Sequence, residues 1–325
     1  HHLIACPLFT KICSFSGVLT NAEIPKLGSI EDLPFIHSSV FKTFQLQSVP
    51  KREIYVQLQS SGTTGSPSII GLSRENAMLQ RLALSKITED FLQVKRPVML
   101  VIDSKETISR NTHFSARKAG IIGFGQLCSK QFFLLDEKMN IITAVLDSIL
   151  RSNQKILVFG FTSLVWSTLQ KLDISEDQRR SLSVNSLLLH GGGWKRLESQ
   201  RVSKEMFNST VSKKLGITDV RNYYGMVEQT GSIFLECEHG FLHENPLSRI
   251  ICRSPKTLDV EYTNRPGIAQ VISPLPVSYP GHSIITDDAI TVLGENCCQC
   301  GRIGKIFSVQ GRTKTSEIRG CSDAH

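Results

Sequence analysis

Residues 60–68 read Ser60-Ser61-Gly62-Thr63-Thr64-Gly65-Ser66-Pro67-Ser68. The two glycines permit a tight turn that presents backbone N–H groups to an anion, and the Ser and Thr hydroxyls add donors for phosphate oxygens. The Gly-Lys-Ser/Thr ending of a Walker loop is absent. A flexible linker would have a similar composition, but we expect a strand over residues 52–59 before the loop and a helix from Ser73 to Asp90 after it. The sequence therefore predicts a phosphate-binding loop.

Short apolar runs alternate with helical stretches farther along the chain. Strands are predicted at 97–103, 155–160 and 183–189, and helices at 141–150 and 164–172. Such alternation is typical of a parallel α/β sheet, which binds ligands at the carboxyl ends of its strands. The two glycine loops, 60–68 and His190-Gly191-Gly192-Gly193, each follow a predicted strand. We therefore expect both at that edge of the sheet.

The pattern changes after about residue 245. Helical periodicity fades there, and proline and glycine separate short apolar stretches. The predicted organisation is an α/β core over residues 1–244, a β-rich subdomain over 245–312 and a C-terminal tail over 313–325.

Composition narrows the classes of partner. The chain has 325 residues, 40% of them apolar, and a net charge of +8. Its basic residues occur as scattered pairs without interleaved aromatics, so we do not expect a nucleic-acid partner. We find neither an apolar run of about 20 residues nor a signal peptide, which predicts no membrane span and a cytoplasmic location. The nine cysteines fit a reducing compartment rather than a disulfide framework.

Two further motifs suit a nucleotide. In Tyr223-Tyr224-Gly225-Met226-Val227-Glu228, a tyrosine ring can stack on a purine and the glutamate can bind Mg²⁺. In Thr286-Asp287-Asp288, followed by Gly311-Arg312, a carboxylate can accept hydrogen bonds from ribose hydroxyls, and the arginine can meet phosphate or ribose. Each motif alone is also compatible with a turn or a solvated surface pair.

Together, in this order and at this rough spacing, the motifs resemble the adenylate-forming superfamily of acyl-CoA ligases, peptide-synthetase adenylation domains and luciferases. The resemblance covers residues 60–320. It implies an α/β fold: the large N-terminal domain of those enzymes, with parallel α/β sheets and a β-rich subdomain. The resemblance stops before the superfamily's C-terminal cap domain, so we expect the cap and its catalytic lysine to be absent. The chain also departs from the broad pattern at Ser68, Val227 and Asp287, where many members have Lys, Thr and Gly.

The resemblance implies a role for each motif. ATP phosphates would be held by Ser60, Ser61, Gly62, Thr63, Thr64 and Gly65. The adenine pocket would be lined by His190, Gly191, Gly192, Gly193, Tyr223, Tyr224 and Gly225. Asp288 and Arg312 would hold the ribose, and Glu228 would bind magnesium, with Glu228 and Arg312 also serving catalysis. Phe124, Phe159, Phe161 and Trp194 are candidates for the wall of an acyl tunnel, although aromatic residues near glycine loops are more often core.

Several segments look like the LuxE-type acyl-protein synthetases: Leu33-Pro34-Phe35-Ile36, Phe41-Lys42, residues 159–163, His190 through Lys195, and Arg319-Gly320-Cys321-Ser322. In that family a fatty acid is adenylated, passed to a cysteine near the protein's own C-terminus and then taken by a partner acyl-protein reductase. The resemblance makes Cys321 the acceptor, carried on a mobile tail. The alternatives are an acyl- or aryl-CoA ligase of the phenylacetate type and a non-catalytic, zinc-stabilised nucleotide-binding scaffold.

Cysteine and histidine cluster in two further segments. Residues 237–243 read Cys237-Glu238-His239-Gly240-Phe241-Leu242-His243, and residues 297–300 read Cys297-Cys298-Gln299-Cys300. Thiolate and imidazole are the ligands that Zn²⁺ prefers, and four of them close a structural site. The predicted set is Cys237, His243, Cys298 and Cys300, with His239 or Cys297 as substitutes. Ordinary thiols, or thiols with a redox role, are the alternatives.

Overall fold

The computed structural model describes residues 1–15, 28–60, 66–109, 115–152 and 154–312, except for the side chains of Lys195 and Arg196. One of its two large sheets has six strands in the order β5-β4-β6-β7-β8-β9. The first five strands are parallel, and β9 runs antiparallel to β8. The strands are β4 (Val98–Ser104), β5 (Lys130–Leu135), β6 (Ile156–Phe161), β7 (Ser186–Gly191), β8 (Val220–Tyr224) and β9 (Phe234–Leu235).

Helices cover both faces of this sheet, because successive side chains of a strand point to opposite faces. Val98, Leu100 and Ile102 of β4 pack with α6 (Ala144–Leu150), α7 (Thr162–Lys171), α8 (Glu176–Asn185) and α9 (Lys204–Leu215). Met99 and Val101 pack with α4 (Arg74–Leu92) and α5 (Ala116–Gly125) on the other face. All seven residues of β4 are buried, as the uninterrupted apolar run predicts.

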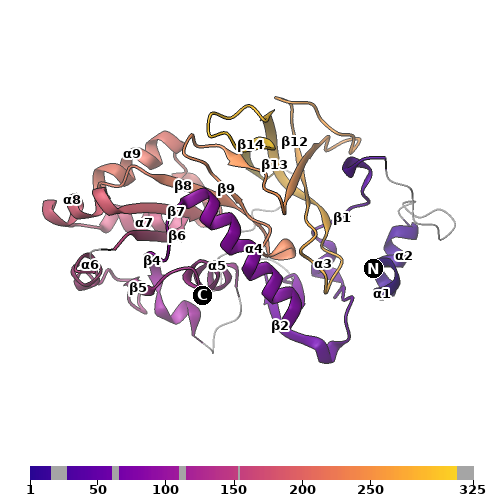
Figure 1. Ribbon diagram of the computed structural model, residues 1–325, viewed down its shortest axis with the longest axis horizontal. Helices are drawn as coiled ribbons and strands as arrows, with labels where there is room; N and C mark the ends of the chain where they lie inside the picture. The colour runs from indigo at the N-terminus through magenta and orange to yellow at the C-terminus, as the bar shows by residue number, and fades with distance from the viewer. Residues whose placement is uncertain (16–27, 61–65, 110–114, 153, 313–325) are drawn as a thin grey trace.

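A second sheet is antiparallel and lies beside the first (Figure 1). Its order is β10-β14-β13-β12-β11, and β1 pairs with β13 in parallel. The strands are β1 (Ile36–His37), β10 (Leu242–His243), β11 (Arg249–Arg253), β12 (Pro266–Ile272), β13 (Ser283–Glu295) and β14 (Lys305–Arg312). Strands β1 and β10 precede residue 245, so this sheet also recruits earlier parts of the chain.

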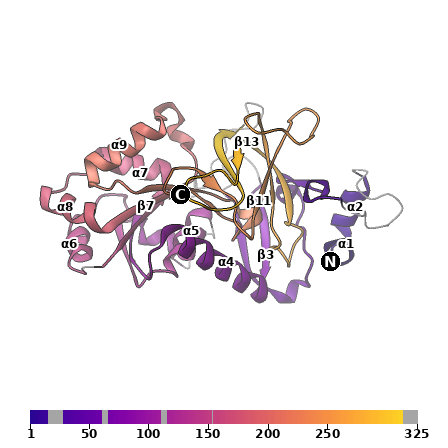
Figure 2. The same ribbon diagram turned by 45° about the horizontal axis from the view of Figure 1, so that its top comes forward.

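Among the remaining elements, α1 and α2 lie at the end of the molecule opposite α6 and α8 (Figure 2). A hairpin of β2 (Ile54–Gln59) and β3 (Ile69–Ser73) precedes α4. Short helices occupy the N-terminal region and connections: α1 (His2–Ala5), α2 (Pro7–Phe15), α3 (Val40–Thr43), and the 3-10 turns η1 (Ile30–Asp32), η2 (Lys51–Glu53), η3 (Lys105–Ile108), η4 (Lys195–Gln200) and η5 (Val227–Gln229). Within the described parts of the chain, no helix is both long and apolar enough to cross a membrane.

The expected strands 97–103 and 155–160 are confirmed as β4 and β6, and the helix after Ser73 as α4, capped by the Ser73 hydroxyl at 3.1 Å from Asn76 N. The strand expected at 183–189 begins only at Ser186, because α8 continues through Asn185. One local prediction is wrong. The loop at 60–68 does not pass from a strand into a helix but joins β2 to β3, which form a separate two-stranded sheet. The five-residue β3 was not predicted from the sequence, because its apolar residues directly precede the helix.

Candidate functional site

A cavity of about 1180 Å³ lies where the two sheets meet. From the parallel sheet it is lined by residues at or just after the carboxyl ends of β6, β7 and β8. From the antiparallel sheet it is lined by Asp288 of β13 and Arg312 of β14. Eight of the predicted nucleotide-binding residues line it together: His190, Gly192, Gly193, Tyr223, Tyr224, Gly225, Asp288 and Arg312. The second glycine loop therefore lies at the carboxyl end of β7, as expected.

Asp288 stands at the junction of the two sheets. Tyr224 donates its hydroxyl proton to Asp288 Oδ2 at 2.8 Å, and Arg312 Nε lies 3.5 Å from Asp288 Oδ1. Arg312 is placed by strand pairing, because it faces Asp288 in the register of β13 and β14. Burial raises the pKa of Asp288, while the Arg312 charge and the Tyr224 hydrogen bond oppose that rise. Burial and the neighbouring carboxylate raise the pKa of Tyr224 well above its usual value.

His190 is buried at the end of β7 and is held in one tautomer. Its Nδ1 lies 2.9 Å from Thr162 Oγ1, and that hydroxyl donates to the carbonyl oxygen of Gly191 at 3.1 Å. Because the threonine proton is used there, His190 Nδ1–H is the donor and Nε2 carries the lone pair. Burial lowers the pKa of His190 to about 3, with Lys204 adding to the effect. The imidazole is therefore a neutral hydrogen-bond acceptor at the cavity wall.

The ring of Tyr223 forms an aromatic layer with two phenylalanines. It stacks on Phe159 at 6.1 Å and meets Phe124 edge-on at 5.3 Å. A β-carbon at Gly191 would lie 2.3 Å from Cε1 of this tyrosine, so only glycine leaves room for the ring. Gly191 thus supports the wall from behind, whereas Gly192 and Gly193 line the cavity. Phe124, Phe161 and Trp194 also line it, and Phe159 belongs to the core beneath.

Glu228 is connected to the predicted phosphate loop. The Ser68 hydroxyl donates to Glu228 Oε1 at 2.6 Å, and both residues are buried. The base of the loop is closed by Ser60, which accepts from Ser68 N through Oγ at 2.8 Å and donates from its own N to Ser68 O at 3.0 Å. Ser68 occupies the position where the resemblance led us to expect lysine. The loop residues Ser61, Gly62, Thr63, Thr64 and Gly65, and the tail residue Cys321, lie outside the described residues.

Some cavity residues were missed at the sequence level. Lys204 donates to Glu236 Oε1 and to the carbonyl oxygen of Gly240, and Glu236 Oε2 accepts from Asn222 N at 2.9 Å. Arg201 lines the cavity and donates to the carbonyl oxygen of Gln310. No motif marks these residues, because contacts between positions as far apart as Lys204 and Glu236 (32 residues) leave no local pattern. Thr162 could have been found, since it lies in the quoted segment 159–163.

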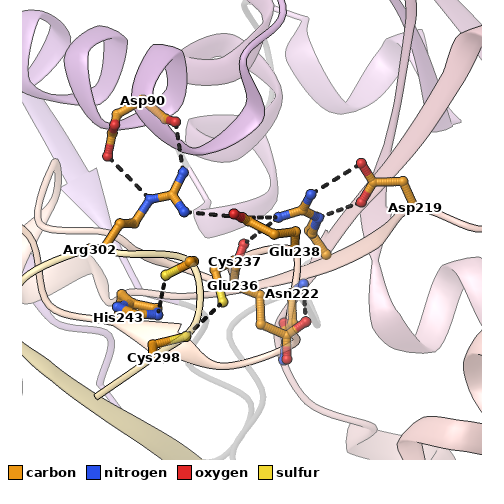
Figure 3. Close-up of polar contacts among 11 residues, drawn as sticks. Asp90, Asp219, Asn222, Glu236, Cys237, Glu238, His243, Cys298 and Arg302 are labelled. Atoms are coloured by element: carbon orange, nitrogen blue, oxygen red, sulfur yellow. Dashed lines mark hydrogen bonds and ion pairs between the residues drawn. The ribbon is translucent and has the colours of Figure 1, made fainter. Parts of the chain in front are cut away.

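The four predicted zinc ligands form a separate cluster. Single ligand atoms of Cys237, His243, Cys298 and Cys300 all lie within 4.8 Å of one another. The suggested substitutes do not belong to this group, and both His239 and Cys297 are exposed. Figure 3 shows the cluster beside a chain of ion pairs that runs through Arg302 and Glu238.

The two sheets are arranged as in the large domain of adenylate-forming enzymes. A crystal structure of 2-hydroxyisobutyryl-CoA ligase in an open conformation shares this fold with a TM-score of 0.74 at 13% identity, over 96% of this chain and 66% of that one. ATP-bound MatB from Rhodopseudomonas palustris has a TM-score of 0.54 at 15% identity, over 82% of this chain and 49% of that one. The chain thus spans just under two thirds of the length of the ligase.

A family model resolves the class further. The model of the acyl-protein synthetase family LuxE matches residues 1–325, and the chain belongs to this family. A relative in the family, the long-chain-fatty-acid–luciferin-component ligase of Vibrio harveyi, is 22% identical over 308 residues. That match covers 90% of this chain and 77% of the relative.

Proposed function

We propose that this chain activates a fatty acid with ATP and transfers the acyl group to the thiol of its own Cys321. The observation that carries the proposal is the cavity in which His190, Tyr223, Tyr224, Asp288 and Arg312 converge from two sheets. Membership of the acyl-protein synthetase family supports the same reaction. The acyl-cysteine would then pass to a reductase partner.

The cavity has space and chemistry for two substrates. Its volume exceeds the about 300–1,000 Å³ of ordinary small-molecule pockets. The polar lining, from the strand ends and the antiparallel sheet, suits a nucleotide: Tyr223 offers a ring face, His190 Nε2 an acceptor for an exocyclic amine, and Asp288 an acceptor for ribose hydroxyls. The apolar lining, from β2, β3, α4 and α5, suits an acyl chain; it includes Val56, Leu58, Leu72, Leu84, Ala119 and Ile122.

Glu228 is our proposed ligand for Mg²⁺. A carboxylate oxygen is the hard ligand that this ion takes, and the hydrogen bond from Ser68 fixes the side chain beside the base of the phosphate loop. Bound magnesium would neutralise charge on the phosphates as pyrophosphate leaves. The protein's own contribution is to hold this carboxylate in one position.

The reaction we propose has two steps. A carboxylate oxygen of the fatty acid attacks the α-phosphorus of ATP, the bond to the β-phosphate oxygen breaks, and pyrophosphate leaves. The thiolate of Cys321 then attacks the carbonyl carbon of the acyl-adenylate, a thioester forms, and AMP leaves with the electron pair of the cleaved bond. The cation at Arg312 and the donors of the 60–68 loop would stabilise the charge that develops on phosphate oxygens. The thiol proton is released to solvent.

A labelling experiment tests the proposal. The protein is incubated with ATP, Mg²⁺ and radiolabelled fatty acid, and hydroxylamine-labile label on the chain is measured. We expect label on the wild type and on Cys128→Ser, a control thiol in the connection between α5 and β5, and none on Cys321→Ser. Label that appears only on added CoA would instead identify an acyl-CoA ligase. Absence of both acyl-AMP and pyrophosphate with every acid tried would leave the non-catalytic scaffold.

A further inference from the structure

The Cys/His cluster lies at the seam between the two sheets. Cys237 follows β9 of the parallel sheet by two residues, and His243 lies in β10 of the antiparallel sheet. Cys298 and Cys300 lie in the connection between β13 and β14, the two strands that also carry Asp288 and Arg312. Four side chains from one strand and two strand connections therefore lie close together (Figure 3).

Two distances between ligand atoms match those of a tetrahedral zinc site, and all four ligand atoms lie within 4.8 Å of one another. Zn–S bonds of about 2.3 Å and Zn–N bonds of about 2.0–2.1 Å place two sulfurs about 3.8 Å apart, and a sulfur and a nitrogen about 3.6 Å apart. The Sγ atoms of Cys237 and Cys298 are 3.8 Å apart, and Cys300 Sγ lies 3.4 Å from His243 Nε2. A disulfide would require about 2.05 Å, and all three cysteines are free thiols.

We propose that Cys237, His243, Cys298 and Cys300 bind one structural Zn²⁺ that fastens the antiparallel sheet to the parallel sheet beside the nucleotide cavity. Three thiolates, one neutral imidazole and Zn²⁺ carry a net charge of −1. All four positions are filled by protein, and a closed site of this kind stabilises structure rather than catalysing a reaction.

A charged network supports the site from outside. Arg302, two residues after Cys300, donates to Glu238 Oε2 at 3.0 Å and to the carbonyl oxygen of Asp90 in α4 at 2.9 Å. Its guanidinium also lies over the ring of Phe91, 4.4 Å from the ring centroid. Glu238 continues the network to Arg221 of β8 at 3.6 Å. The ligand-bearing connections are thereby tied to a helix and a strand of the core, and a positive charge lies beside the anionic cluster.

The position of the site links it to nucleotide binding. Tyr223 and Tyr224 of β8 pair with Leu235 and Phe234 of β9, which leads directly into Cys237. Asp288 and Arg312 lie on the two strands whose connection carries the other thiols. Loss of the metal would loosen both walls of the cavity at once. We therefore expect metal removal to weaken nucleotide binding, although none of the four zinc-binding side chains lines the cavity.

Metal content and a spectrum test the site directly. Elemental analysis of the full chain, purified without chelator, should give about one zinc per chain, as expected for a closed four-ligand site. The Cys298→Ser/Cys300→Ser variant should lose it, and Cys128→Ser should keep it. Because the double variant could fail to fold, the wild type is also loaded with Co²⁺, which should show the intense visible bands of tetrahedral, thiolate-bound cobalt. Wild type with well under one zinc per chain, or six-coordinate cobalt bands, overturns the proposal.

The structural role has its own measurement. Removal of the metal with a strong chelator should lower Tm and weaken binding of AMP several-fold, and stoichiometric Zn²⁺ should restore both. Unchanged Tm and AMP affinity in demonstrably metal-free protein would overturn the role as a fastener. These readouts need no adenylation activity, so their failure is distinct from failure of the proposed reaction.

Discussion

Asp288 and Asp287 are adjacent carboxylates in different surroundings. Asp288 lines the cavity with Tyr224 and Arg312, whereas Asp287 pairs with His37 at 3.2 Å outside it. Asp288→Asn should raise the Kd for ATP about 10- to 100-fold, because a hydrogen bond to a charged group contributes about 1.5–3 kcal/mol. Asp287→Asn is the matched control and should change the Kd less than about three-fold. Calorimetry measures the Kd for ATP in both variants. An equal rise of the Kd in the two variants would show that Asp288 does not bind the ribose.

His190 predicts a pH dependence of stability. Burial lowers its pKa from 6.5 to about 3, so below 6.5 the unfolded chain takes up a proton that the folded chain does not. The free energy of unfolding therefore falls as pH drops from 6.5 towards 3. Between about pH 7 and pH 5 this residue accounts for a loss of about 2 kcal/mol. Urea denaturation at both pH values should show a shallower dependence in His190→Gln; an unchanged dependence would contradict burial of the neutral ring.

Among the elements, those with uninterrupted apolar runs were predictable. β4 and β6 are buried on both faces, and their sequences show it without reference to any partner. The hairpin strand β3 was missed because its identity depends on pairing with β2, which local composition does not reveal. Helix α9 also has a pattern that predicts it. Phe207, Val211 and Leu215 recur every four residues and form its buried face. In the site, motif order anticipated the cavity residues, but not contacts such as that of Lys204 with Glu236.

Helix α5 offers a test of the acyl-binding side. Gly123 lines the cavity, and a β-carbon there would lie 2.9 Å from a methyl group of Leu84 in α4. Gly123→Leu should fill space between these helices and lower kcat/KM for long-chain acids at least about 10-fold, because one methylene in an apolar pocket changes selectivity by about 10–200-fold. Short acids and the KM for ATP should change little. Pyrophosphate release measures the kinetic constants for the acids and for ATP. Gly123→Ala should lower kcat/KM for long-chain acids less than Gly123→Leu does. An equal loss of kcat/KM for long and short acids would show that the acyl chain binds elsewhere.

At the scale of the whole molecule, the cavity is built by neither sheet alone. The parallel sheet supplies His190 and Tyr223, the antiparallel sheet supplies Asp288 and Arg312, and the Tyr224–Asp288 hydrogen bond joins them. The cysteine cluster joins the same two sheets at another point. A bound acyl-adenylate would add a third connection. Occupancy of the cavity should therefore stabilise both sheets together rather than one of them.

A non-hydrolysable acyl-adenylate analogue tests this coupling. At about 100 times its Kd it should stabilise the protein by about 2.7 kcal/mol and raise Tm by about 5 °C. Hydrogen exchange should slow in β8 and in β13 alike, because residues of both strands line the cavity that the analogue would occupy. In Asp288→Asn, at the same analogue concentration, protection from hydrogen exchange should decrease in both β13 and β8. Protection confined to the parallel sheet would show that the antiparallel sheet does not contribute to binding, and would contradict the two-sheet site.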